Sequence, residues 1–527
     1  MKIEIKDKNV TVVGIARSGI GAANLLSELG ANVTVTDIKT KEELKDSIQG
    51  LDPSVRLVLG GHPENIFVSA DMLVVSPGVP LDIPPIINAK SRGVTVIGEF
   101  ELAYQIATQS IEQAGFLAVT GTNGKSTTTA LLDFMMKKGG FRTVLGGNIG
   151  NALTGEIHER TREPENRGIG EVTVSNERGL SQIYGHSRRI GTVPESIDFK
   201  TIDYIVTEVS SFQLESIKDF RPKVATILNI TPDHLDRYHS FEEYSDAKAR
   251  IFENQKEDDF LVLNWDDPAT MKVKSEKLKS EKPRIVYFSR KEEVEGLYFK
   301  DGMIYCNLPP MMGTVLIPPQ PPFIKGGKGG LLAGKSGTVP SVPLIRADEI
   351  RIKGVHNLEN AMAASAMALI ANCPLETVID SLREFPGLEH RLEFVKEINA
   401  VRYFNDSKGT NVGAVMKSLE SFIEPIILIA GGRDKAGDFS QLRHLVRDKV
   451  KTLVLIGEAS EKIKIALGDL TETVMAQDLR EAVRISRSMA VKGDVVLLSP
   501  ACASFDMFVN FEDRGRQFKK IVMEMNS

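Results

Sequence analysis

Short apolar runs recur along the chain, and each is followed by a glycine-rich or polar turn and then by a stretch whose apolar residues have helical spacing. The first runs are Asn9–Val13, Ala31–Thr36, Met72–Val75 and Val94–Ile97. Strands that alternate with helices predict an α/β fold built on parallel sheets. Ligands of such sheets bind at the carboxyl ends of the strands, so the turns after these runs are candidate sites.

The same alternation continues through the rest of the chain. The later predicted strands are Gly115–Val119, Thr143–Leu145, Ile202–Thr207, Val224–Ile230, Tyr403–Asn405, Ile426–Ala430, Leu453–Ile456 and Val495–Leu498. A chain of 527 residues is long enough for about three domains. We expect an N-terminal Rossmann-like domain at 1–106, a central P-loop ATPase-type parallel sheet at 107–388 and a C-terminal Rossmann-like domain at 389–527.

Two segments interrupt this pattern inside the predicted central domain. Residues 156–196 are polar and charged with little apolar periodicity, and residues 309–343 are dense in proline and glycine. Such composition disfavours both helix and sheet. We expect two inserted mobile loops, and neither contains a recognisable chemical motif.

Composition narrows the class of protein. The net charge of -5 argues against a nucleic-acid partner, because a phosphate backbone requires a basic face. The three cysteines are far apart without a CxxC pair, which favours a reducing compartment. The N-terminus does not resemble a signal peptide, and the apolar runs are too short for a membrane span. We expect a cytoplasmic enzyme that is monomeric.

The turn after Gly115–Val119 has the composition of a phosphate-binding loop. Glycines allow backbone N–H groups to approach phosphates, and the N-terminus of the following helix adds a positive partial charge. Lys125 would reach the terminal phosphates of ATP, and the Ser126 hydroxyl would bind Mg²⁺. The alternative, a glycine turn with a chance lysine, fits the flanking strand and helix less well. The ATP-binding candidates are Gly121, Thr122, Asn123, Gly124, Lys125, Ser126 and Thr127.

The first turn of the chain, residues 14–21, is a variant of the dinucleotide-binding fingerprint. Ala16 stands where that pattern has a glycine, and Asp37 stands where an acidic residue often receives a ribose or a base. Another glycine turn, Ser76–Gly78, follows a later strand. A turn without any ligand remains an alternative at this point.

Metal-competent residues end two strands of the central region. Glu208 follows Ile202–Thr207, and His234 comes shortly after Val224–Ile230, as a magnesium–phosphate site requires. The alternative for His234 is a helix-start histidine bonded to its own loop. Lys248 falls on the apolar stripe of a predicted helix that begins at Phe241, where the usual explanation is a surface lysine whose ammonium group reaches water.

Polar residues also follow the strands of the third region. Lys408 and Lys435 lie at two strand ends and suit a carboxylate or a phosphate. Asn357 and Asn360 lie one turn apart on a predicted helix and suit an adenine edge, with helix capping by Asn357 as the alternative. Cys502 has no histidine near it in sequence, so we interpret it as a small buried residue.

Four strings taken together resemble the Mur ligase family of peptidoglycan synthesis. They are Thr120–Thr127, Glu208–Glu215, Asn405–Asn411 and Ser499–Asp506. The resemblance covers nearly the whole chain apart from the two insertions. It implies a ligase in which ATP phosphorylates a substrate carboxylate and an incoming amine then attacks the acyl phosphate.

The resemblance also implies roles for individual residues. Lys125, His234 and Lys248 would be catalytic, and Ser126, Glu208, His234 and a carbamylated Lys248 would hold Mg²⁺. The ATP contacts would include Asn357, Asn360, His390, Arg391 and Asp406. The nucleotide substrate would contact Arg17, Ser18, Asp37, Ser76, Gly78 and Asn148. The amino-acid pocket would consist of Lys408, Thr410, Lys435, Ser504, Phe505 and Phe511.

The strings Ser-Ser-Phe-Gln-Leu-Glu and Ser-Pro-Ala-Cys-Ala-Ser resemble the family member that joins D-glutamate to UDP-N-acetylmuramoyl-L-alanine. Ala16 departs from the family's first turn and leaves the uracil contacts open. The alternatives are another Mur-type ligase or a folylpolyglutamate synthase-like enzyme, which would not need a uridine-binding domain. A further alternative is a non-catalytic nucleotide-binding scaffold, which would not need to retain metal ligands.

Overall fold

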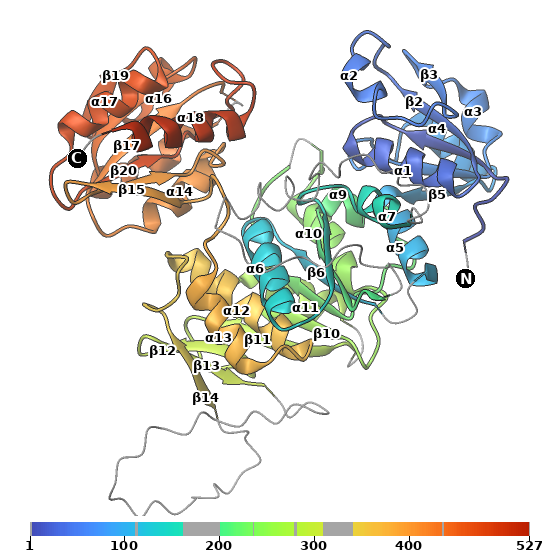
Figure 1. Ribbon diagram of the computed structural model, residues 1–527, viewed down its shortest axis with the longest axis horizontal. Coiled ribbons are helices and arrows are strands. Elements are labelled where there is room, and N and C mark those ends of the chain that lie inside the picture. The colour runs from blue at the N-terminus through green and yellow to red at the C-terminus, as the bar shows by residue number, and fades with distance from the viewer. Residues whose placement is uncertain are drawn as a thin grey trace, which may run out of the picture. The chain divides into compact units, whose positions relative to one another are not determined.

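The computed structural model describes residues 3–110, 114–161, 201–234, 237–278, 282–308, 341–434 and 437–525. They form two compact units, each coloured by position along the chain in Figure 1. The first unit contains the described chain up to Ile350 together with Glu359–Phe385, and the second contains Arg351–Leu358 and the chain from Pro386 onward. The fold is α/β with three sheets, two in the first unit and one in the second.

The N-terminal sheet of the first unit is entirely parallel, with strand order β3-β2-β1-β4-β5. Its strands are β1 (Asn9–Val13), β2 (Asn32–Asp37), β3 (Arg56–Leu59), β4 (Met72–Val75) and β5 (Thr95–Gly98). Its helices are α1 (Arg17–Glu28), α2 (Lys45–Ile48), α3 (Glu64–Val68), α4 (Pro84–Ser91) and α5 (Glu99–Ser110). All four residues of β4 are buried, because a parallel strand with helices on both faces has no polar side.

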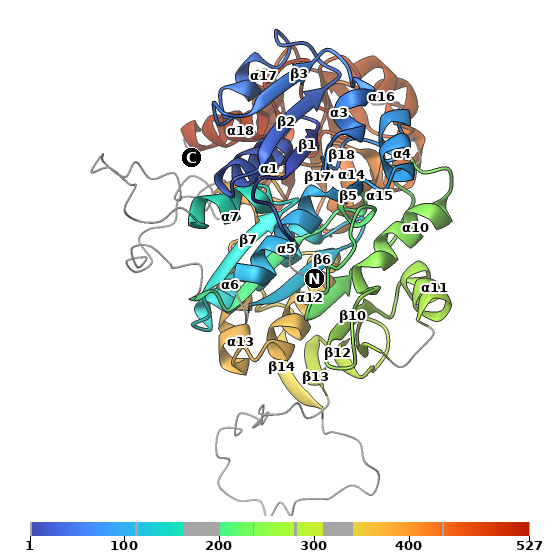
Figure 2. The ribbon, with the colours of Figure 1, turned by 90° about the vertical axis from the view of Figure 1, so that its right-hand side faces the viewer.

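The central sheet of the first unit has the order β14-β13-β12-β11-β10-β9-β6-β8-β7, and Figure 2 shows several of its strands. The strands are β6 (Gly115–Thr120), β7 (Thr143–Gly147), β8 (Tyr204–Glu208), β9 (Val224–Ile227), β10 (Phe260–Asn264), β11 (Arg284–Ser289), β12 (Gly296–Lys300), β13 (Met303–Asn307) and β14 (Val342–Arg346). Its helical segments are α6 (Lys125–Lys138), α7 (Leu153–Thr161), α9 (Ser211–Leu214), α10 (Phe241–Ala249), η3 (Arg250–Phe252), α11 (Pro268–Lys277), α12 (Val355–Ile370) and α13 (Leu375–Glu384). Pairing is parallel from β7 to β12 and antiparallel for β12–β13 and β13–β14.

One predicted boundary of each insertion is wrong. Residues 156–161 belong to α7, in which Leu153 and Ile157 are fully buried one turn apart, and α7 packs against α1 and α5. The remainder of that segment, 162–196, lies outside the described residues. In the second segment β14 begins at Val342, and residues 309–340 lie outside the described residues. Within the predicted insertion α7 has one apolar residue, Ile157, which is too few to reveal a one-sided helix in the sequence.

The second segment should be dispensable for folding. Antiparallel pairing places Cys306 of β13 opposite Val342 of β14, so the two ends of the segment already lie next to each other. Replacing residues 309–340 with a short glycine–serine link is expected to leave the thermal midpoint within about 3 °C of the original, because closing a loop costs little when its ends are adjacent. Ile304→Ala, which removes a fully buried side chain of β13, is a positive control for loss of stability in the same hairpin. A fall of about 10 °C in the link variant would show instead that the segment packs against the domain.

The second unit contains one sheet, with strand order β15-β16-β20-β17-β18-β19. Its strands are β15 (Glu393–Ile398), β16 (Val401–Asn405), β17 (Ile426–Gly431), β18 (Val450–Ile456), β19 (Glu472–Met475) and β20 (Val495–Leu498). Its helical segments are α14 (Val412–Glu420), η4 (Phe439–Leu442), α15 (Arg443–Lys449), α16 (Ser460–Leu467), α17 (Leu479–Met489) and α18 (Phe511–Glu524). Only β15 runs antiparallel among these six strands, and β16 and β17 flank β20. Across the described part of the chain, no helix combines the length and apolar character needed to cross a membrane.

Candidate functional site

The turn between β6 and α6 is shaped by two glycines. Gly121 has φ +149° and Gly124 has φ +85°, values that favour glycine. A side chain at Gly124 would also collide with the Asn360 amide oxygen. Helix α6 begins at the next residue, so its first N–H groups open toward the loop, which is the arrangement that binds phosphate.

Two lysines meet at one carbonyl of this turn. The Lys125 ammonium donates to the carbonyl oxygens of Gly121 at 2.9 Å and Thr122 at 3.0 Å. The Lys248 ammonium donates to the same Gly121 oxygen at 2.9 Å. The structure thus brings Lys248 of α10 to the phosphate-binding turn.

Lys248 does not reach water, so the interpretation as a surface lysine is wrong. Its side chain is 1% exposed and its ammonium lies 4.6 Å from the centre of the Tyr244 ring. Burial, with the charge of Lys125 as a smaller cause, holds the pKa of Lys248 well below its ordinary value, and Asp233 and Glu208 partly oppose this. Such a low pKa favours a neutral amine at this position.

Glu208, the last residue of β8, has the character of a metal ligand. It is 2% exposed, and its Oε1 accepts a hydrogen bond from Asn148 Nδ2 at 2.8 Å. Its Oε2 is buried and has no hydrogen-bond partner among the residues that the structure describes. A buried carboxylate oxygen without a donor is costly unless a cation or water satisfies it, so Glu208 fits Mg²⁺.

His234 occupies a turn, not a helix start. Its φ is +55°, its ring Nε2 lies 3.7 Å from Asp233 Oδ2, and its side chain is about half exposed. Its backbone N–H donates to Asp233 Oδ1 at 2.9 Å, so it does bond within its own loop, as the alternative proposed. The Phe212 ring contacts the His234 ring edge-to-face at 4.9 Å between centres. Among the described residues, the ring nitrogens of His234 have no hydrogen-bond partner beyond the 3.7 Å contact with Asp233.

A cavity of about 490 Å³ lies at the carboxyl ends of the N-terminal sheet, and residues from the central sheet complete its wall. Asp37 accepts hydrogen bonds from the backbone of Ile15 at 2.8 Å and Lys39 at 2.9 Å, which fixes the carboxylate beside the first turn. A side chain at Gly19 would overlap the Gly14 carbonyl, so the turn keeps its tight glycine contact despite Ala16. All six residues predicted for the nucleotide substrate line the cavity, namely Arg17, Ser18, Asp37, Ser76, Gly78 and Asn148.

The sequence prediction missed other lining residues, among them Lys39, His62 and Gln213. Gln213 was visible in the string Glu208–Glu215, but nothing in its spacing assigns it to a cavity on another sheet.

The two asparagines of α12 are buried and hydrogen-bonded. Asn360 Oδ1 accepts from Thr128 Oγ1 at 3.2 Å, which joins α12 to the start of α6 within the first unit. Asn357 Nδ2 donates to the carbonyl of Lys353 at 2.8 Å. The helix begins at Val355, two residues before Asn357, so the alternative that Asn357 caps this helix is wrong.

In the second unit, Asp406 and His390 are both buried. Asp406 accepts hydrogen bonds from the hydroxyls of Ser418 and Ser499, each at 2.6 Å, and burial raises its pKa to about 6. Burial lowers the pKa of His390 to about 4, so its ring is neutral near pH 7. Arg391 follows His390 directly in sequence.

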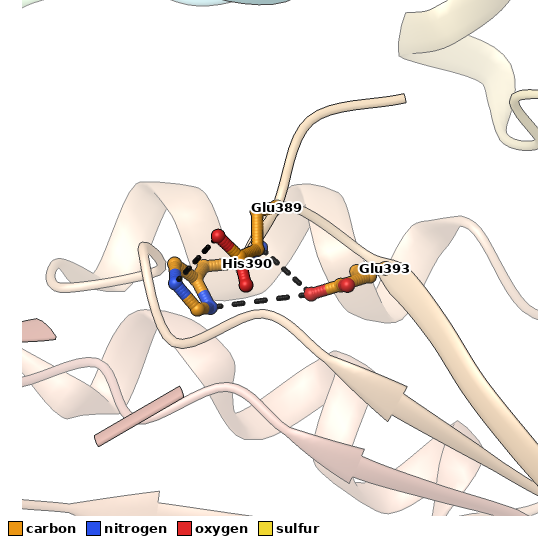
Figure 3. A group of neighbouring side chains, drawn as sticks. All are labelled: Glu389, His390 and Glu393. Carbon is orange, nitrogen blue, oxygen red and sulfur yellow. Dashed lines mark hydrogen bonds and ion pairs between the residues drawn. The ribbon is translucent and has the colours of Figure 1, made fainter. Parts of the chain in front are cut away.

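Figure 3 shows the His390 ring with dashed lines to the carboxylates of both Glu389 and Glu393. Oxygen or nitrogen atoms of Glu389, His390 and Glu393 lie within 4.8 Å of one another, a spacing compatible with a metal ion. The Lys519 ammonium, however, pairs with Glu389 at 2.9 Å and Glu393 at 2.5 Å. That ammonium already supplies the positive charge, so the cluster is an ion-pair network in this structure.

The predicted amino-acid pocket falls on two loops of the second unit. Lys408 and Thr410 follow β16, and Ser504 and Phe505 follow the neighbouring strand β20. The Lys408 ammonium lies 3.9 Å from the centre of the Phe511 ring at the start of α18. Lys435 lies outside the described residues.

Arg514 of α18, which the sequence prediction missed, connects these two loops. It is fully buried and donates to Ser407 Oγ at 2.9 Å, to the Ser407 carbonyl at 2.9 Å and to the Cys502 carbonyl at 3.2 Å. Burial lowers its pKa to about 10. Its spacing of four and eight residues from the buried Phe518 and Val522 is a signal that could have revealed it.

Three family models match consecutive parts of the chain. They are described as "Mur ligase MurD-like, N-terminal domain" at residues 8–98, "Mur ligase middle domain" at 119–309 and "Mur ligase, glutamate ligase domain" at 390–502.

Among solved structures, UDP-N-acetylmuramate-alanine ligase MurC from Thermotoga maritima is 17% identical with a TM-score of 0.52, covering 98% of this chain and 99% of its own. MurF from Acinetobacter baumannii is 13% identical with a TM-score of 0.53, covering 98% of this chain and 91% of its own. These two structures share the fold.

Curated sequences are much more similar. A protein named UDP-N-acetylmuramoylalanine–D-glutamate ligase from Citrifermentans bemidjiense is 43% identical over 522 residues, which is 99% of this chain and 98% of that protein. One with the same name from Caldanaerobacter subterraneus is 38% identical over 529 residues, covering 99% of this chain and all of that protein. The chain therefore belongs to the Mur ligase family and, within it, to the group of the UDP-N-acetylmuramoylalanine–D-glutamate ligases.

Proposed function

We propose that this chain joins D-glutamate to UDP-N-acetylmuramoyl-L-alanine at the expense of ATP, in the synthesis of peptidoglycan precursors. The γ-phosphoryl group of ATP would pass to the alanyl carboxylate and leave an acyl phosphate and ADP. The amine of D-glutamate would attack the carbonyl carbon, lose a proton and expel phosphate, which forms the new amide. Full-length relatives at about 40% identity carry the name of this activity.

The observation that carries the proposal is the pair Glu208–Asn148. Asn148 lines the cavity and donates to Glu208, and Glu208 stands opposite Val119 at the end of the strand that leads into the phosphate loop. One hydrogen bond thus connects the cavity for the nucleotide substrate to the place where ATP phosphates would bind. A cavity of about 490 Å³ suits a nucleotide-sized ligand.

Lys125 would hold the transferring phosphoryl group. Its ammonium now donates to two carbonyls of the turn, and these bonds keep it at the N-terminus of α6, where the phosphate negative charge would lie. We propose that the P-loop residues Gly121–Thr127 and Asn360 bind ATP in the first unit.

Mg²⁺ is the metal that we propose for this site, held by Ser126, Glu208, His234 and a carbamate on Lys248. The buried and unpaired Oε2 of Glu208 supports it. When bound, Mg²⁺ would neutralise charge on the phosphates during transfer.

In the second unit, we propose Asn357, Arg391 and Asp406 as ATP contacts and Lys408, Thr410, Ser504, Phe505 and Phe511, with Lys435, as D-glutamate contacts. The arrangement of Lys408 above the Phe511 ring supports a cationic pocket for a dicarboxylate.

The experiment that tests the proposal is phosphate release by the purified protein with UDP-N-acetylmuramoyl-L-alanine, D-glutamate and magnesium ATP, each omitted in turn. We expect release only with all components, and at least about tenfold less with L-glutamate, because a pocket with fixed cationic contacts discriminates between the two configurations. Release with a folate and glutamate in place of the UDP substrate would favour the folylpolyglutamate synthase-like alternative. No release with any combination would favour a nucleotide-binding scaffold.

A further inference from the structure

Arg237 is not among the residues proposed above to bind ATP, Mg²⁺ or D-glutamate, yet its guanidinium group joins its own loop to two other segments of the first unit. Its Nη2 donates to Glu215 Oε2 at 2.7 Å and its Nη1 donates to the Pro77 carbonyl at 3.3 Å. Its guanidinium carbon lies 4.3 Å from the centre of the Phe212 ring. The side chain is only 20% exposed, so these contacts are sheltered from water.

The contact with Pro77 acts on the wall of the cavity. Pro77 lies in the turn after β4, and the whole turn Ser76–Gly78 lines the cavity. On its other side this turn is tied to the first glycine turn, because Ser76 Oγ donates to the Gly14 carbonyl at 3.0 Å. Arg237 bonds a backbone oxygen, so it constrains the path of the turn itself.

The contact with Phe212 connects Arg237 to the His234 ring. One face of the Phe212 ring carries the guanidinium group, and the same ring meets the His234 ring edge-to-face at 4.9 Å. The neighbouring Gln213 lines the cavity. The position of the Phe212 ring therefore affects both His234 and the cavity wall.

Glu215 holds the guanidinium in its orientation. Its Oε1 accepts a hydrogen bond from the Tyr238 hydroxyl at 2.5 Å, while its Oε2 accepts from Arg237. The Tyr238 ring is buried and stacks on Phe212 with an interplanar angle of 25°. A planar guanidinium can stack on a ring and donate in two directions at once, which an ammonium group cannot do.

We propose that Arg237 is a positioning residue that keeps the Ser76–Gly78 wall of the cavity and the His234 ring at a fixed separation. The alanyl carboxylate of the nucleotide substrate would thereby be held at the correct distance from the phosphate loop. This inference rests on the proposed function, because it assigns the cavity to the UDP substrate and His234 to the metal.

The test compares Arg237→Met and Arg237→Lys with the unmodified enzyme. We expect the KM for UDP-N-acetylmuramoyl-L-alanine to rise about tenfold in both variants, and its Kd without ATP, measured by calorimetry, to rise by about the same factor. The KM values for ATP and D-glutamate should stay within about twofold, since the contacts of Arg237 with described residues are to Pro77, Glu215 and Phe212 and not to the P-loop. Glu215→Gln should shift the UDP-substrate KM in the same direction by a smaller factor.

The matched control is Arg346→Met, which removes an exposed arginine that is paired with Asp348. It should leave all three KM values unchanged. If Arg237→Met does not fold, Arg237→Lys and Glu215→Gln still carry the test, with circular dichroism to verify their fold.

The outcomes separate the two claims. If the unmodified enzyme is active and Arg237→Lys has the same KM for the UDP substrate, the positioning role is overturned. A lower kcat in the variants without a change in KM or Kd for the UDP substrate would also overturn it. An unmodified enzyme that releases no phosphate with the UDP substrate and D-glutamate would instead overturn the proposed function.

Discussion

Lys125→Ala is expected to lower the turnover number of the purified enzyme by about a thousandfold or more. The migrating phosphoryl group carries negative charge that is spread over its oxygens, and catalysis of its transfer depends on fixed positive charge nearby. Lys125 is held at this place by two backbone carbonyls, so its charge is already oriented before ATP binds. Phosphate release under saturating substrates measures the loss.

The fold should tolerate this change. Lys125 is partly exposed, and its two hydrogen bonds are to a loop, so we expect the free energy of unfolding to fall by about 1 kcal/mol. Lys138→Ala, at the other end of the same helix and paired with Glu384 at 2.8 Å, is the matched control and should retain full activity. Near-normal turnover in folded Lys125→Ala would exclude this residue from phosphoryl transfer.

The local parts of the site were predictable from sequence. Gly121 and Gly124 take backbone angles that favour glycine, so their place between an apolar run and a helix identifies the phosphate loop. Lys248 has helical spacing from Tyr244, which predicts its place on the apolar stripe of α10 but not the burial of its ammonium group. The turns that line the cavity follow predicted strands for the same reason: the carboxyl ends of parallel strands meet at one edge.

The parts that depend on tertiary contacts were not predictable. Gln213 and Arg237 reach the N-terminal sheet from the central one, and no spacing in the chain encodes which turn they meet. The antiparallel strands β13 and β14 are separated by the proline- and glycine-rich segment, so the first two residues of β14 were assigned to a loop. Ile157 lies in a polar stretch, and it is buried where α7 packs against α1 and α5, a contact that the sequence does not encode.

Lys248 is the second residue whose loss should nearly abolish activity, and the expected reason is a carbamate on its side chain. An ammonium group here would lie beside Lys125 and would repel Mg²⁺. Burial and that neighbouring charge favour the neutral amine, which can attack CO₂, form an N–C bond and lose a proton. The product is an anionic oxygen ligand of the kind that Mg²⁺ prefers.

Lys248→Ala is therefore expected to lower turnover by about a hundredfold or more while ATP binding, measured by calorimetry, stays within about threefold. Folding should not suffer, because a buried lysine whose one hydrogen bond described here is to the Gly121 carbonyl contributes little to stability. Short carboxylates should partly restore the variant, and bicarbonate should restore unmodified enzyme that was stripped of CO₂. Lys272→Ala, which removes a lysine at the surface near Glu242, is the control. Native mass spectrometry should find one CO₂ added to Lys248 in the active enzyme, and an unmodified lysine in active, substrate-bound enzyme would refute the carbamate.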